Sequence, residues 1–192
     1  MLNQKLFIMK VKILILATLF SCVLIMADAQ TPTFQKGDKV LNLGIGLGGY
    51  SPTGYQVITP SASASFEVGI SSNDTDKGSI GIGGYIGYAG YKESGDYIGN
   101  NYWKVTRILI GARGVLHFPI AKKLDTYGGL TLGIMTRSWK WNGLVDRTDH
   151  PDRKPFGGDL FVGGRYYFSD KIAAMGELAL GAYLTLGISV KF

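Results

Sequence analysis

The sequence is poor in cysteine and histidine, and it lacks a long apolar run. It holds one cysteine, Cys22, two histidines and six prolines. Because Cys22 lies inside an N-terminal apolar stretch, the rest of the chain can form neither a disulfide nor a cysteine-based metal site. No run reaches the roughly 18 apolar residues that a transmembrane helix needs. These absences exclude a disulfide-rich scaffold and argue against a helical membrane protein.

The chain also has only a small net charge. The formal charge of the whole chain is +6, and residues 30–192 contain seventeen basic and thirteen acidic residues. These charges are spread over predicted connections and one face of predicted strands and form no continuous basic run. A nucleic-acid-binding surface is therefore not expected.

The N-terminus has the three parts of a secretory signal peptide. Basic residues up to Lys12 precede the apolar run 13–26, and the small residues Ala27 and Ala29 follow it. We expect residues 1–29 to be cleaved and Gln30 to begin the mature chain. Translation from Met9 instead of Met1 would leave an equally complete signal peptide. A membrane helix is the weaker alternative, because no positive stop-transfer flank follows the run.

Cys22 itself has two interpretations. The residues before it loosely resemble the lipobox of bacterial lipoproteins, which would make Cys22 an acylated N-terminus. Phe20 is bulky for that motif, and the apolar run continues past the cysteine. A role as filler of the signal peptide is therefore favoured.

The rest of the chain repeats an alternation of apolar residues with small or polar ones. In the last segment, one face carries Leu184, Leu186, Ile188, Val190 and Phe192, and the other carries Thr185, Gly187, Ser189 and Lys191. A period of two is typical of β-strands. Similar segments occur at 39–50, 61–70, 79–91, 103–118, 124–138, 156–168, 172–180 and 184–192. The pattern predicts an all-β fold, an antiparallel up-and-down transmembrane β-barrel of about eight strands with its polar face inside.

The connections between these segments alternate in length, as they do in membrane barrels. Short polar turns at 71–78, 119–123 and 169–171 are expected on the periplasmic side. External loops are expected at 51–60, 92–102 and 139–155, with a tight turn at 181–183. The predicted organisation is a signal peptide over 1–29, a short periplasmic segment over 30–38 and the barrel over 39–192. Phe118, Tyr166, Phe168 and Phe192 would form a periplasmic aromatic girdle.

Three stretches carry a family resemblance. The segments 36–40, 164–171 and 187–192 resemble those of small bacterial outer-membrane β-barrel domain proteins of eight strands. The resemblance implies integral location in the outer membrane of a Gram-negative envelope and contact with its lipids, including lipopolysaccharide. It also implies that the barrel-insertion machinery recognises Phe192 during biogenesis. It brings no catalytic residues.

Four charged residues fall on the inward faces of the predicted strands. They are Glu67, Arg113, Arg165 and Glu177. Counting from the periplasmic strand ends places all four in one layer, where opposite charges can pair across the lumen. An unpaired charge there would cost several kcal/mol, so a paired network that fills the barrel is favoured over a proton or ion pathway. An eight-stranded barrel has no room for an open pore.

The predicted external loops supply candidate contact residues. Tyr97, Trp141 and His150 are the candidates for contact with a surface partner, which the sequence does not identify. Tyr102, Trp103 and Trp139 lie nearer the strand ends and would form an outer interfacial belt.

Enzymatic and metal sites receive little support. His150 could act with Ser138 and Asp149, as in barrel enzymes that modify lipid A, but no spacing motif supports this. The acidic residues around His150 alternate with basic ones, which favours a solvated loop over a cation site. We therefore expect no cofactor, no metal and no catalysis.

The functional expectation is a non-enzymatic envelope protein whose external loops serve surface interaction, adhesion or envelope integrity. A barrel enzyme acting on outer-membrane lipid, or a narrow transporter of small solutes, is the alternative. A secreted barrel of lipocalin type is the third possibility, and it would need its apolar face turned inward around a ligand.

Overall fold

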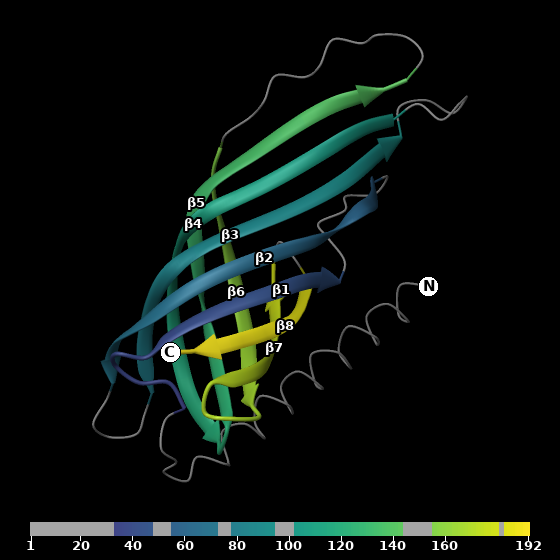
Figure 1. Cartoon of the computed structure of the whole chain (residues 1–192). Helices are drawn as coiled ribbons and strands as arrows, with labels where there is room; N and C mark the ends of the chain where they lie inside the picture. The colour runs from purple at the N-terminus through teal and green to yellow at the C-terminus, as the bar shows by residue number, and fades with distance from the viewer. Residues whose placement is uncertain (1–32, 48–54, 73–77, 95–101, 144–154, 181–182) are drawn as a thin grey trace, which may run out of the picture.

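Eight antiparallel strands close into a barrel (Figure 1). The computed structural model describes residues 33–47, 55–72, 78–94, 102–143, 155–180 and 183–192. The strands are β1 (Lys39–Leu47), β2 (Tyr55–Ser72), β3 (Ser79–Ser94), β4 (Tyr102–Ala121), β5 (Leu124–Asn142), β6 (Phe156–Tyr167), β7 (Ile172–Ala179) and β8 (Tyr183–Lys191). Each strand pairs with the next in sequence, and β8 pairs with β1. The predicted fold class is confirmed. No helix among the described residues is long and apolar enough to cross a membrane.

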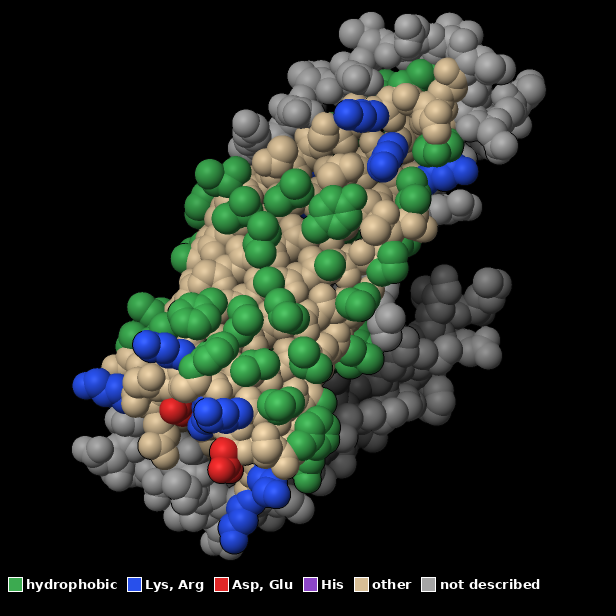
Figure 2. Space-filling model, in the orientation of Figure 1, with side chains coloured by type: hydrophobic (Ala, Val, Ile, Leu, Met, Phe, Trp, Pro, Cys, Tyr) green, Lys and Arg blue, Asp and Glu red, His purple; other side chains and the backbone are tan. Residues whose placement is uncertain are grey.

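The barrel is apolar outside and polar inside. The outward side chains include Ile45, Ile82, Ile110, Ile134, Leu160 and Ile188, all of them exposed. The buried polar side chains include Asn42, Glu67, Arg113, Asp125, Arg165 and Glu177. Figure 2 shows the apolar side chains as a band that separates charged residues at the two ends of the molecule. Such a band requires hydrocarbon around it, so the barrel spans a membrane. A lipocalin-type barrel is excluded, because it would bury this face.

The strands differ greatly in length. β2, β3, β4 and β5 have 16 to 20 residues, whereas β1, β6, β7 and β8 have 8 to 12. A tilted strand crosses the membrane with about 9 to 11 residues. The long strands therefore continue past the apolar band at one end and form a raised wall there (Figure 1).

Part of each of three predicted external loops is in fact strand. β2 begins at Tyr55, β3 runs to Ser94, and β5 runs to Asn142. The predictions of loops from 51, 92 and 139 were wrong over these residues, because the apolar alternation ends at the edge of the band while strand pairing continues. β2 keeps its pairing to β3 through register shifts around Thr59.

The opposite end has short turns, as in periplasmic ends of membrane barrels. β4 and β5 are joined at Lys122 and Lys123, and Lys123 has a φ of 64°. The described part of the segment before β1, residues 33–38, folds against this short-turn end. There the Gly37 amide donates to the Gly69 carbonyl at 2.9 Å, and the Gly69 amide donates to the Asp38 carbonyl at 2.9 Å.

Candidate functional site

A ring of four ionisable side chains fills the lumen near the short-turn end. Two carboxylates, Glu67 and Asp125, each contact both His117 and Arg165. Asp125 lies 2.8 Å from His117 Nδ1 and 2.8 Å from Arg165 Nη1. All four side chains are at least 96 % buried. Each charge is thus paired within a closed cycle, as burial in a low dielectric requires.

Phe34 covers this ring from the short-turn end. Its ring stacks on His117 with 4.0 Å between centroids and 17° between planes. Its backbone carbonyl accepts a hydrogen bond from Ser79 Oγ at 2.8 Å, and the side chain is 1 % exposed. An aromatic side chain from outside the strands therefore closes the lumen.

A second ion pair lies further along the lumen. Arg113 Nη2 donates to Glu177 Oε2 at 2.8 Å, and Tyr127 Oη donates to the same oxygen at 3.3 Å. The Arg113 guanidinium also lies 3.6 Å from the centroid of the Phe161 ring. Hydrogen bonds through Ser65 and Asn42 link this pair to Arg165.

The structure therefore places the four predicted lumen charges in two linked groups rather than one layer. Glu67 and Arg165 belong to the ring, and Arg113 and Glu177 form the separate pair. Sequence reasoning placed His117 inside but missed Asp125. The sequence could have shown this, because Asp125 lies two residues before the inward-facing Tyr127 and residues two apart in a strand point to the same side.

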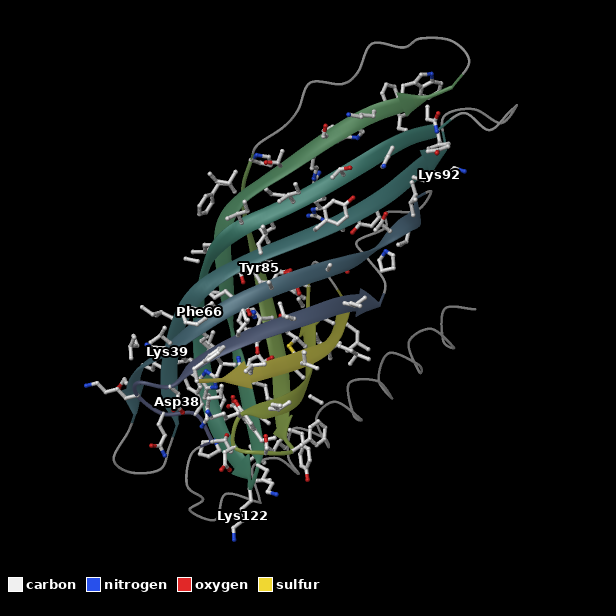
Figure 3. All side chains as sticks on the ribbon, in the orientation of Figure 1. Asp38, Lys39, Phe66, Tyr85, Lys92 and Lys122 are labelled. Carbon is white, nitrogen blue, oxygen red and sulfur yellow. The ribbon has the colours of Figure 1, made fainter. Side chains whose placement is uncertain are left out.

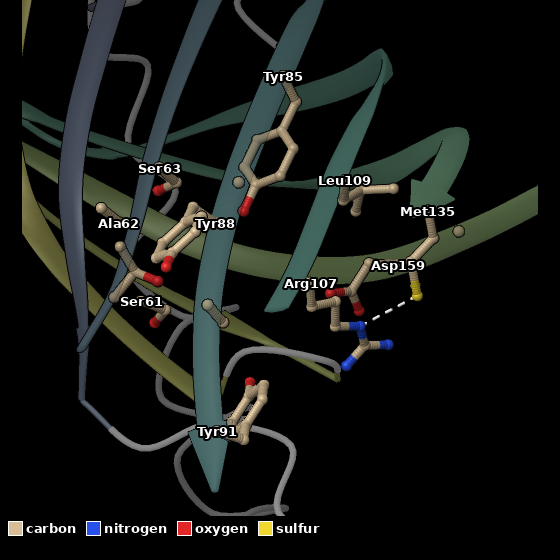
Figure 4. A pocket seen from close by; sticks show the side chains of 14 residues that line it. Ser61, Ala62, Ser63, Tyr85, Tyr88, Tyr91, Arg107, Leu109, Met135 and Asp159 are labelled. Atoms are coloured by element: carbon tan, nitrogen blue, oxygen red, sulfur yellow. Dashed lines mark hydrogen bonds between the residues drawn. The ribbon is translucent and has the colours of Figure 1, made fainter. Parts of the chain in front are cut away.

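A cavity of about 70 Å³ lies in the outer half of the lumen (Figure 4). Its lining includes Tyr85, Tyr91, Arg107, Met135 and Asp159. Arg107 Nε donates to Met135 Sδ at 3.0 Å. The lumen is thus filled by side chains in its inner half and holds this small cavity in its outer half.

The raised wall is lined on its inner side by aromatic residues. Trp103 and Trp141 pair with ring centroids 5.0 Å apart at 57°. Trp139 packs against a buried cluster of Ala89, Tyr91 and Val105. The expected outer interfacial belt is wrong for Trp103 and Trp139, because both positions alternate with the inward-facing residues of their strands. Trp141 is half-buried. The other two candidate contact residues, Tyr97 and His150, lie outside the described residues.

Three lysines form a row on the outer side of the same wall. Lys92 of β3 is the register partner of Lys104 on β4, and Lys104 is the partner of Lys140 on β5. They share the parity of lipid-facing residues such as Ile110, so they point away from the lumen. Lys104 and Lys140 are exposed, and the Lys92 ammonium lies 4.5 Å from the Tyr102 ring centroid.

The predicted aromatic girdle lies at the short-turn end. Phe118, Tyr166, Phe168 and Phe192 are all exposed on the outside. The rings of Tyr166 and Phe168 are 5.7 Å apart. The role of Phe192 as a barrel-insertion signal stays a prediction.

Within the described part of the chain, no group of three or more histidine, cysteine or acidic side chains is arranged to hold a metal ion. The acidic cluster around His150 lies outside that part.

Known structures identify the fold. The chain is similar to Ail, the attachment invasion locus protein of Yersinia pestis, crystallised with the heparin analogue sucrose octasulfate, with a TM-score of 0.54 at 12% sequence identity, over 82% of this chain and 100% of that one. It is also similar to the N-terminal β-barrel domain of Pseudomonas aeruginosa OprF, with a TM-score of 0.44 at 15% identity, over 82% and 98%. For Neisserial surface protein A the TM-score is 0.44 at 14% identity, over 81% and 96%. The fold is that of the small eight-stranded outer-membrane barrels. No family model and no curated protein matches the sequence.

Proposed function

We propose that this protein is a non-enzymatic outer-membrane barrel that binds anionic glycans at the cell surface through its raised wall. The row of Lys92, Lys104 and Lys140 carries the proposal. Neighbouring strands lie about 4.8 Å apart, so the row presents closely spaced ammonium groups on three strands. One exposed charge contributes little to binding, but several charges that engage one polyanion act together.

The position of the row supports a role at the outer surface. Figure 3 places Lys92 at the end of the barrel that carries the raised wall, far from Lys39 and Lys122 at the short-turn end. The inner half of the lumen supports a non-enzymatic role, because its charged groups already bind one another.

The fold neighbour Ail has been crystallised with the heparin analogue sucrose octasulfate, which is an anion-rich glycan analogue. That likeness is one of fold alone, so the lysines of this chain have to carry the argument. The same row would also meet the phosphates of lipopolysaccharide, and the test must separate the two.

The test measures binding of a fluorescent heparin oligosaccharide to the mature protein in phosphatidylcholine nanodiscs without lipopolysaccharide. We expect binding that weakens as salt is raised. Changing Lys92, Lys104 and Lys140 together to Gln should abolish most of it.

The matched control changes Lys39, Lys122 and Lys171 to Gln, which removes the same charge at the short-turn end. Equal loss of binding in the control, or none in the first variant, would contradict the proposal. If added lipopolysaccharide competes with heparin for the first set of lysines, both polyanions share the row.

A further inference from the structure

The N-terminal segment, residues 33–38, reaches the lumen through a tight turn. The Asp38 amide donates to the Gln35 carbonyl at 3.1 Å, and the Gln35 amide donates to Asp38 Oδ2 at 2.9 Å. Gly37 lies within this turn with a φ of 91°, a left-handed value that glycine adopts without strain. The turn reverses the direction of the chain, so Phe34 lies inside the barrel and not beside β1.

The N-terminal segment contacts strands from both ends of the barrel sequence. Its backbone pairs with Gly69 of β2, and one of its carbonyls accepts a hydrogen bond from Ser79 Oγ of β3. On β8, Lys191 Nζ donates to the Thr33 carbonyl at 3.1 Å and lies 3.3 Å from Asp38 Oδ2. Figure 1 shows β8 ending beside the start of β1. The segment therefore joins β8 to β2 and β3 across the line where β8 closes on β1.

These contacts require a barrel that is already closed. Thr33 and Lys191 are 158 positions apart in the sequence, so their contact closes a loop that includes all eight strands. The Phe34 ring lies on His117 of β4, and His117 in turn contacts Glu67 of β2. The complete docking place for the segment therefore exists only after β8 has paired with β1.

We propose that the N-terminal segment is a latch, which docks after the barrel has closed and slows the separation of β8 from β1. These two strands have 9 residues each, whereas β4 has 20. Fewer backbone hydrogen bonds join short strands, so the closure between β1 and β8 separates more easily than the pairing of β4 with its neighbours. The latch spans this closure. An interaction that forms after the transition state for folding slows unfolding and leaves the folding rate unchanged.

The test uses a single thiol as the reporter of docking. Residues 30–192 contain no cysteine, so Ser79→Cys gives the mature protein its only thiol. Ser79 is 5 % exposed and lies beneath the latch, where its hydroxyl bonds to the Phe34 carbonyl. In detergent micelles, a water-soluble maleimide should therefore label this thiol slowly while the latch is docked.

Gly69→Ala should undock the latch and leave the strands in place. A Cβ at Gly69 would overlap the backbone carbonyl of Gln35, and the three atoms nearest to it all belong to Gln35 and Phe34. We expect labelling at position 79 and the unfolding rate in heated detergent to rise about tenfold each, and the refolding rate to change less than about twofold. The matched control is Gly84→Ala, whose Cβ meets nothing within 4 Å. It should neither raise labelling nor speed unfolding.

Lys191→Met tests the link to β8 separately. It removes the ammonium group that contacts the latch and keeps an unbranched side chain. We expect unfolding to become about threefold faster, again with a nearly unchanged refolding rate. Lys171→Met removes the same charge from an exposed position at the same end of the barrel and should leave both rates unchanged.

The order of assembly is measured on the Ser79→Cys protein with all other residues unchanged. The chain is refolded from urea into micelles and sampled for its gel mobility and for maleimide labelling. The fast-moving closed form should appear first, and protection of the thiol should follow it.

Three results would overturn the proposal. Protection of the thiol together with the gel shift would mean that the segment does not dock late. Refolding slowed in Gly69→Ala as much as unfolding is accelerated would mean that the segment helps the barrel to form. Faster labelling with an unchanged unfolding rate would mean that the segment covers the lumen without holding the closure. If Gly69→Ala does not fold, Lys191→Met and the order of assembly decide between these outcomes.

Discussion

Phe34 stacks face to face on His117, although Phe34 precedes the first strand and His117 lies in the fourth. The two nitrogens of the imidazole contact Asp125 and Glu67, so the phenyl ring covers the whole charged ring from the short-turn end. Exclusion of water strengthens the electrostatic interactions that it covers. The segment before β1 is therefore part of the barrel's interior packing.

Phe34→Ala should destabilise the barrel strongly. Loss of a buried phenyl group typically costs about 3 to 5 kcal/mol, and water would then reach the ion pairs. The measurement is heat-modifiability in detergent, the temperature at which the fast-moving unboiled form on a gel converts to the slower unfolded form. The control is Phe66→Ala, which makes the same change on the lipid-facing side of β2. An equal fall of the unfolding temperature in both variants would show that Phe34 does not close the lumen.

The Arg113–Glu177 pair should show partial rescue. Glu177→Gln leaves the Arg113 guanidinium buried without its carboxylate, and such a loss costs about 3 to 5 kcal/mol. Removing the second charge with Arg113→Gln in the same chain should recover part of that loss, so the double variant should melt above the value that the two single variants predict by addition. Strictly additive effects would mean that the pair contributes no coupling.

Gly133→Ala should destabilise the barrel where Gly114→Ala does not. Gly133 and Gly111 face each other across β4 and β5. A Cβ added at Gly133 would overlap the Ile110 carbonyl oxygen, which is backbone and cannot move aside cheaply. Crowding of this kind costs about 1 to 3 kcal/mol. A Cβ at Gly114 meets nothing within 4 Å. Equal melting temperatures for the two variants would contradict the close approach of these strands.

Alternation alone was sufficient to predict the strands inside the membrane. The lipid demands an apolar side chain at every second position, as at Ile108 and Ile110, so the sequence pattern is strict there. Beyond the apolar band, water surrounds the strands and polar side chains can lie on either face. The alternation of apolar residues therefore disappears there. The outer part of β2, which includes Pro60, therefore had the composition of a loop, although it pairs with β3.

The partners inside the lumen could not be predicted from single strands. Asp125 is the cross-strand partner of Arg165, and this depends on the register between β5 and β6. Register is set by two strands together. The alternation within one strand shows only which face of the barrel wall a side chain lies on. Phe34 carries no periodic signal at all, because it lies outside every strand. Its burial depends on the backbone bonds that hold residues 33–38 against Gly69.

In the ring of Glu67, Asp125, His117 and Arg165, two mutations together should cost more stability than the sum of the single mutations. In the Arg113–Glu177 pair, two mutations together should cost less than that sum. Either Glu67→Gln or Asp125→Asn alone leaves Arg165 with one carboxylate, so each should cost a moderate amount of stability. The two changes together leave Arg165 buried with no carboxylate beside it, and the loss should exceed the sum of the single effects by about 1 to 3 kcal/mol.

The same melting measurement distinguishes the possible results. Adding Arg165→Gln to the double variant should raise its melting temperature, because the uncompensated charge is then gone. The Asn42 side chain, whose Oδ1 lies 3.1 Å from Arg165 Nε, is a neutral acceptor and cannot replace a carboxylate. A double variant no worse than the sum, or a triple variant no better than the double, would show that the two carboxylates act independently and that the closed ring carries no energetic coupling.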